Sequence, residues 1–290
     1  MRPIVLHHGL FGFDKIEIKN FRLNYWGKVP DLLSKLGYKV YISKVGKTQS
    51  IEQRSIELHE FMKRHDIKDA HLVCHSLGGL DARFLLDRYI TQEDKVNIST
   101  LTTLGSPHHG SEFMDLLSLK LGLGYRYNKV VDCPTPKSVL YQLMYYLDQP
   151  AYSCLTTEYC KYFNKTVSIN PMTKYFSIGA SFKCKQEFIH DTADSIVHNE
   201  LKDMPLLKIL TLKKLEDYMG LLERITFIMT NELNDGLVTL KSSHFEKQLT
   251  HLEGSHWDLV DKSGRFGYAM EEPVEEMYLK IVTNLKKFDE

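Results

Sequence analysis

The chain lacks the features that mark several large classes of protein. No apolar run approaches the ~20 residues that span a bilayer as a helix. There is no basic excess, because Lys plus Arg and Asp plus Glu both number 37, and this balance argues against nucleic acid as the main partner. Repeats and low-complexity tracts are also missing. With 290 residues, 43% of them apolar and 26% charged, the composition is that of a globular protein with a full core.

Cysteines are few, and their spacing does not suggest pairing. The five of them are an odd number and form no CxxC motif of the metal-binding type. The first residues leave no room for a signal peptide before a strand-like run begins. These features favour free thiols in a reducing compartment. We therefore expect an intracellular protein, in the cytoplasm or the mitochondrion.

Short apolar runs alternate with longer segments of helical spacing. Helices are predicted over residues 28–36, 51–64 and 78–89, with Ser50 as the N-cap of the second. Strands are predicted over residues 3–7, 39–43, 70–74, 99–104, 174–178 and 225–229. Short, almost uniformly apolar strands that alternate with helices predict an α/β fold with a mostly parallel central sheet flanked by helices. We interpret residues 1–290 as a single domain.

Two segments interrupt this alternation. Residues 112–170 are rich in Leu and Tyr and offer no clear strand, and residues 183–222 include a second leucine-rich helical stretch. We interpret the first as a helical cap or lid over a site at the strand ends and the second as a further helical insertion. The alternative for both is a set of ordinary helices that complete the core.

The run CHSLGG at residues 74–79 carries the strongest chemical signal. An apolar strand leads directly into Ser76, and a helix begins after it. A sharp strand-to-helix turn of this kind exposes a serine as a nucleophile, and small residues two before and two after it make room for the turn. Gly78 meets that requirement, and Cys74 replaces the usual glycine with another small side chain. The alternative is a glycine-rich turn without chemistry, or one that binds phosphate.

Partners for such a serine occur elsewhere in the chain. The turn at Gly9 can direct the backbone N–H of Leu10 toward the serine, and the N–H of Leu77 at the helix start is a second oxyanion donor. Asp235 is the candidate acid, and His256 is the candidate base, 21 residues later. The order Ser, Asp, His is that of α/β-hydrolases.

Other histidines compete for the role of base. His251 is the chief alternative, but His256 is preferred because a short polar and glycine-containing loop precedes it. We interpret His75, His108 and His109 as pocket-lining residues, because each follows a strand end on the wrong side of the nucleophile.

A set of motifs distributed over most of the chain resembles one lipase family. The motifs are VLHHGLFGFD (5–14), YWG (25–27), SIEQRSIEL (50–58), CHSLGGLDAR (74–83), LTTLGSPHHGSE (101–112), LTTEYCKYF (155–163), YFSIGASF (175–182), NDGLV (234–238) and HWD (256–258). Together they are similar to the family that includes bacterial triacylglycerol lipases and their fungal mitochondrial relatives. The resemblance implies an α/β-hydrolase fold with a mobile helical lid over an apolar acyl pocket. It also implies Ser76 as nucleophile, Asp235 as acid, His256 as base, and Leu10 and Leu77 as oxyanion donors.

Bacterial members of that family carry a structural calcium near the catalytic histidine. Asp258 matches one ligand position. Lys262 stands where a neutral amide ligand is expected, and no second carboxylate completes the site. We therefore predict no cofactor and no metal, with Asp258 as the one calcium-ligand candidate.

The residues and the resemblance together predict a serine hydrolase of lipid esters, most specifically a triacylglycerol lipase. Phospholipase, thioesterase and acyltransferase activities use the same triad and remain alternatives. An inactive hydrolase fold that serves as a binding protein is the alternative of another class. Contact with a membrane or lipid-droplet surface is expected to be peripheral, and no residue pattern predicts an oligomeric state.

Overall fold

A computed structural model describes residues 1–10, 12, 15–18, 21–90, 96–124, 126–127, 148–182, 226–227 and 229–289. Its main sheet has six strands in the order β4-β1-β5-β6-β7-β8, and every neighbouring pair is parallel. The strands are β1 (Ile4–His7), β4 (Val40–Ile42), β5 (Asp69–His75), β6 (Asn97–Leu104), β7 (Lys174–Ser181) and β8 (Lys247–Glu253). Strands β2 (Lys15–Ile18) and β3 (Phe21–Asn24) form a separate antiparallel pair. The predicted α/β class with a parallel sheet is confirmed.

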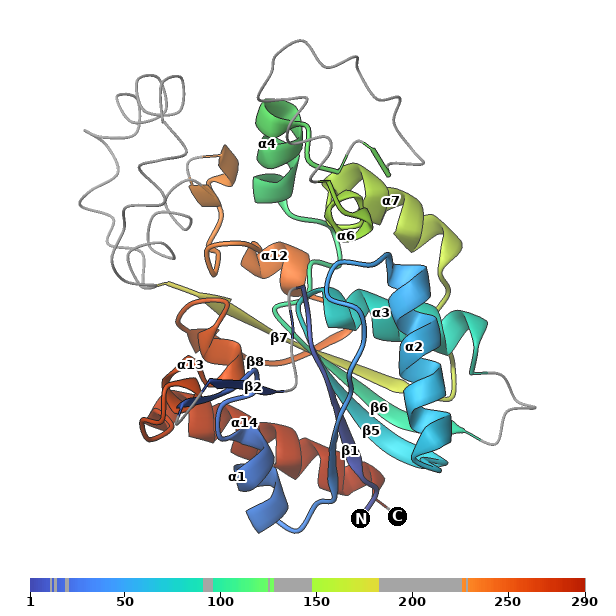
Figure 1. Ribbon diagram of the computed structural model, residues 1–290, viewed down its shortest axis with the longest axis vertical. Coiled ribbons are helices and arrows are strands. Elements are labelled where there is room, and N and C mark those ends of the chain that lie inside the picture. The colour runs from blue at the N-terminus through green and yellow to red at the C-terminus, as the bar shows by residue number, and fades with distance from the viewer. Residues whose placement is uncertain are drawn as a thin grey trace.

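Helices cover both faces of this sheet (Figure 1). The longer ones are α1 (Val29–Lys35), α2 (Ile51–Arg64), α3 (Leu77–Arg88), α4 (Glu112–Leu121), α7 (Thr157–Thr166) and α14 (Glu272–Leu285). The short ones are α6 (Pro150–Ser153), α12 (Leu240–Ser243), η3 (Asp258–Val260), α13 (Lys262–Arg265) and η4 (Lys286–Phe288). Within the described ranges, no helix has both the length and the apolar character that crossing a membrane requires.

The alternation of strand side chains divides the core into two layers. In β1, Ile4 and Leu6 pack with α1 and α14, whereas Val5 between them packs with α2 and α3. This period of two is what a sheet buried on both faces requires. Each fully buried aliphatic side chain contributes about 1.5–3 kcal/mol, so the two layers together stabilise the platform that carries the site.

Helix α2 begins and ends at the predicted residues. The Ser50 side chain accepts a hydrogen bond from the backbone N–H of Gln53 and so caps the helix, as predicted. The predicted strand at residues 225–229 is wrong. Residues 226–227 and 229–230 are helical, with the Asn231 N–H donating to the Phe227 carbonyl. A short apolar run does not by itself distinguish a strand from a buried helical turn.

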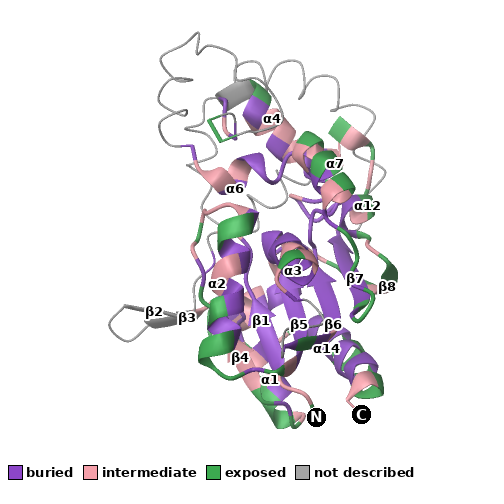
Figure 2. Ribbon diagram, turned by 90° about the vertical axis from the view of Figure 1, so that its right-hand side faces the viewer, coloured by how far each residue is buried: buried purple, intermediate pink, exposed green. Residues whose placement is uncertain are grey.

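The first predicted insertion, residues 112–170, contributes α4, α6 and α7 in its described parts. Figure 2 shows these helices at one end of the buried strands, with both chain termini at the other end. A third apolar cluster, which includes Met114, Leu155 and Phe163, attaches them to the first turns of α2 and α3. Residues 183–222, the second predicted insertion, lie outside the described residues, and a mobile lid stays a prediction.

Candidate active site

Ser76 lies at the sharp turn between β5 and α3. Its backbone adopts φ 55° and ψ −130°, a conformation that L-residues rarely occupy and that surrounding packing must hold. Close contacts leave no room for side chains at the neighbouring glycines. A Cβ at Gly78 would lie 2.8 Å from the His7 carbonyl oxygen, and one at Gly9 would lie 2.6 Å from the Cβ of Ser76. The loop after β1 therefore packs directly against Ser76.

Cys74, the departure from the usual glycine, is accommodated by the core. Its side chain is completely buried in the apolar layer below α2 and α3. Burial raises the pKa of its thiol well above the usual value, so the group stays neutral. Cys74 therefore acts as a small apolar residue under the turn.

Asp235 and His256 form a buried pair, although they are distant in sequence. The His256 Nδ1–H donates to Asp235 Oδ2 at 2.7 Å, and the His256 backbone N–H donates to the Asp235 carbonyl oxygen at 2.9 Å. The other carboxylate oxygen accepts the N–H groups of Leu237 and Val238 at 3.0 and 2.8 Å. These contacts fix the imidazole orientation, and in the neutral ring they make Nε2 the acceptor.

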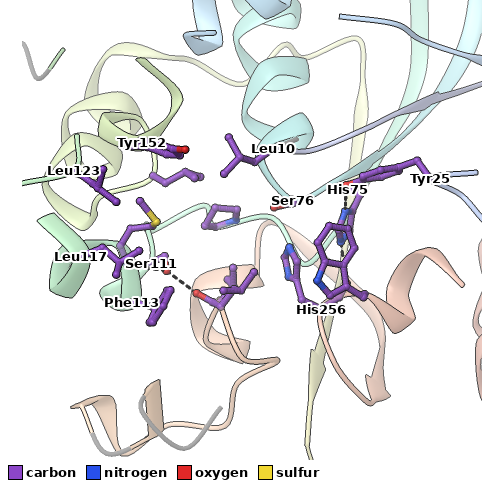
Figure 3. A pocket seen from close by; sticks show the side chains of 16 residues that line it. Leu10, Tyr25, His75, Ser76, Ser111, Phe113, Leu117, Leu123, Tyr152 and His256 are labelled. Atoms are coloured by element: carbon purple, nitrogen blue, oxygen red, sulfur yellow. Dashed lines mark hydrogen bonds between the residues drawn. The ribbon is translucent and has the colours of Figure 1, made fainter. Parts of the chain in front are cut away.

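Ser76 and His256 line the same apolar cavity, which has a volume of about 280 Å³ (Figure 3). Leu10 lines it as well, and Leu77 begins α3 beside Ser76. The first N–H groups of a helix lack an intrahelical partner and are available to an anion. Further lining side chains come from α4, α6, the residues just after these two helices and the loops near Asp235 and His256: Phe113, Met114, Leu117, Leu123, Tyr152, Leu155, Leu237, Val238 and Trp257.

The other predicted histidines are dispersed. His251 is exposed on β8, and the carboxylate of Asp235 is paired with His256 instead. His75 lines the cavity as predicted. His108 does not: it is buried beside Arg83 and stacks on Phe245 with ring centroids 4.6 Å apart.

His109 also departs from the prediction. It lines a separate open groove that it shares with Glu232, Lys241 and His244. Residues 108 and 109 follow β6, and the chain turns away from the cavity there before it returns at Ser111.

Asp258 is not arranged to hold calcium. Its Oδ2 accepts from the backbone N–H and the hydroxyl of Ser255 at 2.6 and 2.7 Å, and its Oδ1 lies 3.2 Å from the Lys262 ammonium. A cation therefore already neutralises this carboxylate. Among the described residues, no group of three His, Cys, Asp or Glu side chains could hold a metal ion.

Two buried hydrogen-bond networks lie around the site, and the sequence does not predict that their members contact one another. One joins Tyr25 and His75, and the other joins Arg54 on α2, Asp81 on α3 and His7 on β1. Each partner lies tens of residues from the next, so neither spacing nor periodicity relates them. Only the folded arrangement reveals that these polar residues share one location.

Comparisons with known proteins agree with this architecture. The chain is 28% identical to triacylglycerol lipase 2 of Saccharomyces cerevisiae, over 98% of this chain and 91% of the yeast protein. It is 32% identical to a triacylglycerol lipase of Vibrio cholerae, but over only 40% of this chain and 35% of that protein. The match to the lipases confirms the resemblance seen in the sequence motifs.

Solved structures share the fold at low sequence identity. Staphylococcus hyicus lipase superimposes with a TM-score of 0.61 at 19% identity, covering 99% of this chain and 96% of that one. The metagenomic carboxyl esterase MGS0156 gives a TM-score of 0.64 at 14% identity, covering 99% and 76%. The fold is therefore that of the α/β-hydrolase lipases and esterases. The family model described as palmitoyl protein thioesterase matches residues 3–256, and the chain accordingly belongs to the palmitoyl protein thioesterase family.

Proposed function

We propose that the protein is a serine hydrolase that cleaves carboxylic ester bonds of lipids, with Ser76 as nucleophile, His256 as general base and Asp235 as the acid that orients it. The observation that carries the proposal is the buried Asp235–His256 hydrogen bond beside an apolar cavity that Ser76 also lines. A serine hydroxyl is a weak nucleophile without a positioned base. The lipases and esterases named above support ester chemistry.

The reaction follows from the orientation of the imidazole. Because Nδ1–H donates to Asp235, Nε2 of His256 accepts the Ser76 proton as Oγ attacks the ester carbonyl carbon. The carbonyl oxygen becomes an oxyanion, to which the N–H groups of Leu10 and Leu77 donate, each contributing about 3 kcal/mol in the transition state. The C–O bond then breaks, and His256 returns the proton to the leaving alcohol.

An acyl group is then esterified to Ser76. Water loses a proton to His256 as it attacks this ester, and the second tetrahedral intermediate collapses to free acid and the Ser76 hydroxyl. Asp235 orients the imidazole and stabilises the imidazolium that forms in each half of the reaction.

The lining of the cavity supports an acyl chain as the group bound there. The side chains from α4, α6 and the Leu237–Val238 turn are aliphatic or aromatic, with Ser111 as a polar exception whose hydroxyl donates to the Leu237 carbonyl. Triacylglycerol is our first candidate, after the named activity of the relatives. We also propose peripheral contact with a membrane or lipid-droplet surface through the end that carries α4, α6 and α7.

Acyl thioester cleavage is the second candidate, because the matching family model is described as a palmitoyl protein thioesterase. The same nucleophile and oxyanion donors serve a thioester, and only the leaving group differs. Matched oxygen and sulfur esters of one fatty acid separate the two. A kcat/KM for the thioester at least tenfold above that for the ester would favour the thioesterase.

Replacing the nucleophile tests the proposed function. Ser76→Ala is expected to reduce hydrolysis of p-nitrophenyl butyrate at least about 10³-fold, because the triad acts as one unit. Circular dichroism should show an unchanged fold. Ser99→Ala, at the far end of β6, is the control and should keep full activity. Wild-type activity in Ser76→Ala, or failure of Ser76 to react with a fluorophosphonate probe, would refute the assignment.

A further inference from the structure

Three buried hydrogen bonds connect the loop after β1 to the backbone of His256. The Gly9 N–H lies 3.1 Å from the Tyr25 hydroxyl oxygen, and that oxygen lies 2.6 Å from His75 Nδ1. His75 Nε2 in turn lies 3.0 Å from the His256 carbonyl oxygen. Figure 3 shows Tyr25 and His75 beside the cavity, next to Ser76 and His256.

The direction of each hydrogen bond is fixed by chemistry. The His256 carbonyl can only accept, so His75 Nε2 carries a proton. Burial lowers the pKa of His75 well below its usual value, with the neighbouring His256 and Arg265 adding to the shift, so the ring is neutral. Nδ1 is therefore bare and accepts the Tyr25 O–H. The Tyr25 oxygen then accepts the Gly9 N–H, which can only donate.

Water cannot easily replace any partner in this chain of hydrogen bonds, because the side chains are buried. Tyr25 is 1% exposed and His75 is fully buried. The His75 and His256 rings pack with centroids 4.5 Å apart, and the Arg265 guanidinium lies 5.3 Å from the Tyr25 ring centroid. Removing one bond would leave a buried donor or acceptor without a partner, which costs more than the bond itself contributes.

The two ends of the chain of hydrogen bonds lie next to the two groups whose positions matter most for catalysis, the Leu10 N–H and the His256 imidazole. Gly9 precedes Leu10, so holding the Gly9 peptide limits where the Leu10 N–H points. At the other end, the His256 peptide is held on both sides: its N–H donates to Asp235, and its carbonyl accepts from His75. Asp235 fixes the ring of the base, and His75 fixes the backbone behind it.

We infer that Tyr25 and His75 are positioning residues that hold the oxyanion loop and the general base in register with each other. The inference rests on the proposed function, because it assigns these residues a role in that reaction. They touch no reacting atom. Their effect is expected in the transition state, through the Leu10 N–H and the His256 imidazole, and hardly at all in the apolar contacts that bind the acyl chain.

The first test is Tyr25→Phe, which removes one hydroxyl and keeps the ring. We expect kcat for p-nitrophenyl butyrate to fall 10- to 100-fold and KM to change less than threefold. Affinity for an alkyl trifluoromethyl ketone, whose adduct resembles the tetrahedral intermediate, should fall in parallel with kcat/KM. Affinity for the matching alkyl ether, which fills only the acyl pocket, should stay unchanged.

Tyr38→Phe is the matched control. Tyr38 is also buried, and its hydroxyl donates to Asp289 at 2.7 Å, near the chain termini. This variant should lose comparable thermal stability and no activity. If Tyr25→Phe behaves in the same way, its hydroxyl is only structural and the inference is overturned.

His75→Gln gives an independent test if Tyr25→Phe does not fold. Glutamine can still donate to the His256 carbonyl but has no acceptor at the Nδ1 position, so it should reproduce the kcat and inhibitor changes of Tyr25→Phe. The double variant should be no slower than the slower single variant, because both break the same bond. Multiplicative losses would refute the coupling.

Ser76→Ala, assayed alongside, separates this inference from the proposed function. An active Ser76→Ala protein refutes the function itself. An inactive Ser76→Ala protein together with a fully active Tyr25→Phe protein refutes only the positioning role.

Discussion

At the scale of single residues, a buried charged network lies beside the proposed triad. Asp81 Oδ2 accepts from Arg54 Nε at 2.8 Å and from His7 Nε2 at 2.9 Å, and all three side chains are fully buried. Arg54 also donates to the His8 carbonyl oxygen at 2.6 Å, immediately before Gly9. The ion pair therefore joins α2 and α3 to the loop that lies against Ser76.

Removing one partner of the Arg54–Asp81 ion pair should strongly destabilise the folded protein. Arg54→Met leaves the Asp81 carboxylate buried without its main counter-charge, and we expect the free energy of unfolding to fall by about 3–5 kcal/mol in urea denaturation. The double variant with Asp81→Leu should recover part of the loss, because no charge then stays buried.

Lys68→Met provides the comparison, because the Lys68–Asp66 pair is exposed to solvent. It should hardly change stability, as is usual for surface ion pairs. If Arg54→Met were as mild as Lys68→Met, the buried pair would not be an important contributor to stability.

At the scale of elements, α4 presents one face to the cavity and another to solvent. Phe113, Met114 and Leu117 line the cavity, whereas Leu119 is 69% exposed. Two residues along a helix correspond to a rotation of about 200°, which explains why Leu117 and Leu119 point in opposite directions. Ser111 caps the helix by accepting the Met114 N–H, so the orientation of its first turn is set from the β6 side.

This arrangement predicts how α4 affects acyl-chain preference. Leu117→Trp should partly fill the cavity and reduce kcat/KM for dodecanoyl esters at least about tenfold, with butanoyl esters changed less than about threefold. Leu119→Trp places the same side chain on the exposed face and should leave both values unchanged. Equal losses for short and long esters in Leu117→Trp would contradict a role of α4 in lining the acyl site.

Comparison of the elements shows which of them sequence patterns are sufficient to predict. Helix α2 and the first five main-sheet strands follow from apolar runs and caps, because those segments are buried on one or both sides. Strand β8 was not predicted, since it is an edge strand whose side chains are mostly exposed and show no apolar run. The site residues on sharp turns, such as Ser76, were identifiable because the turn itself constrains its neighbours. The Tyr25–His75 and Arg54–Asp81 hydrogen bonds were not identifiable from the sequence, because only folding brings each pair together.

At the scale of the whole molecule, desolvation disfavours the charged form of many histidines. Six histidines have lowered pKa values, with desolvation as the largest cause: His7, His8, His71, His75, His108 and His109. The pKa of His8 falls to about 3. Below the ordinary value of 6.5, the unfolded chain binds protons that the folded protein does not. Stability should therefore decrease as pH falls through this range.

We expect the free energy of unfolding to drop by at least about 2 kcal/mol between pH 6.5 and pH 5.5, since each fully buried neutral histidine contributes up to about 1.4 kcal/mol per pH unit. Glu112 and Asp148, whose pKa values are raised by burial, act in the opposite direction. Urea denaturation at several pH values measures the slope. His108→Gln should make the slope shallower, whereas Ser99→Ala, which removes no titratable group, should not. A flat or rising stability on acidification would contradict this picture.

The chain ends also have a practical consequence. The Arg2 backbone N–H donates to Asp289 at 2.7 Å, so both ends meet where the parallel strands begin (Figure 1). Ser76 follows the carboxyl end of β5, and His256, which is hydrogen-bonded to Asp235, follows that of β8, so all three lie at the opposite edge of the sheet. Protein anchored to a bead or fused to a carrier through either terminus would thus keep the cavity that Ser76 and His256 line at the end away from the support. Immobilisation should therefore preserve turnover irrespective of which end is attached.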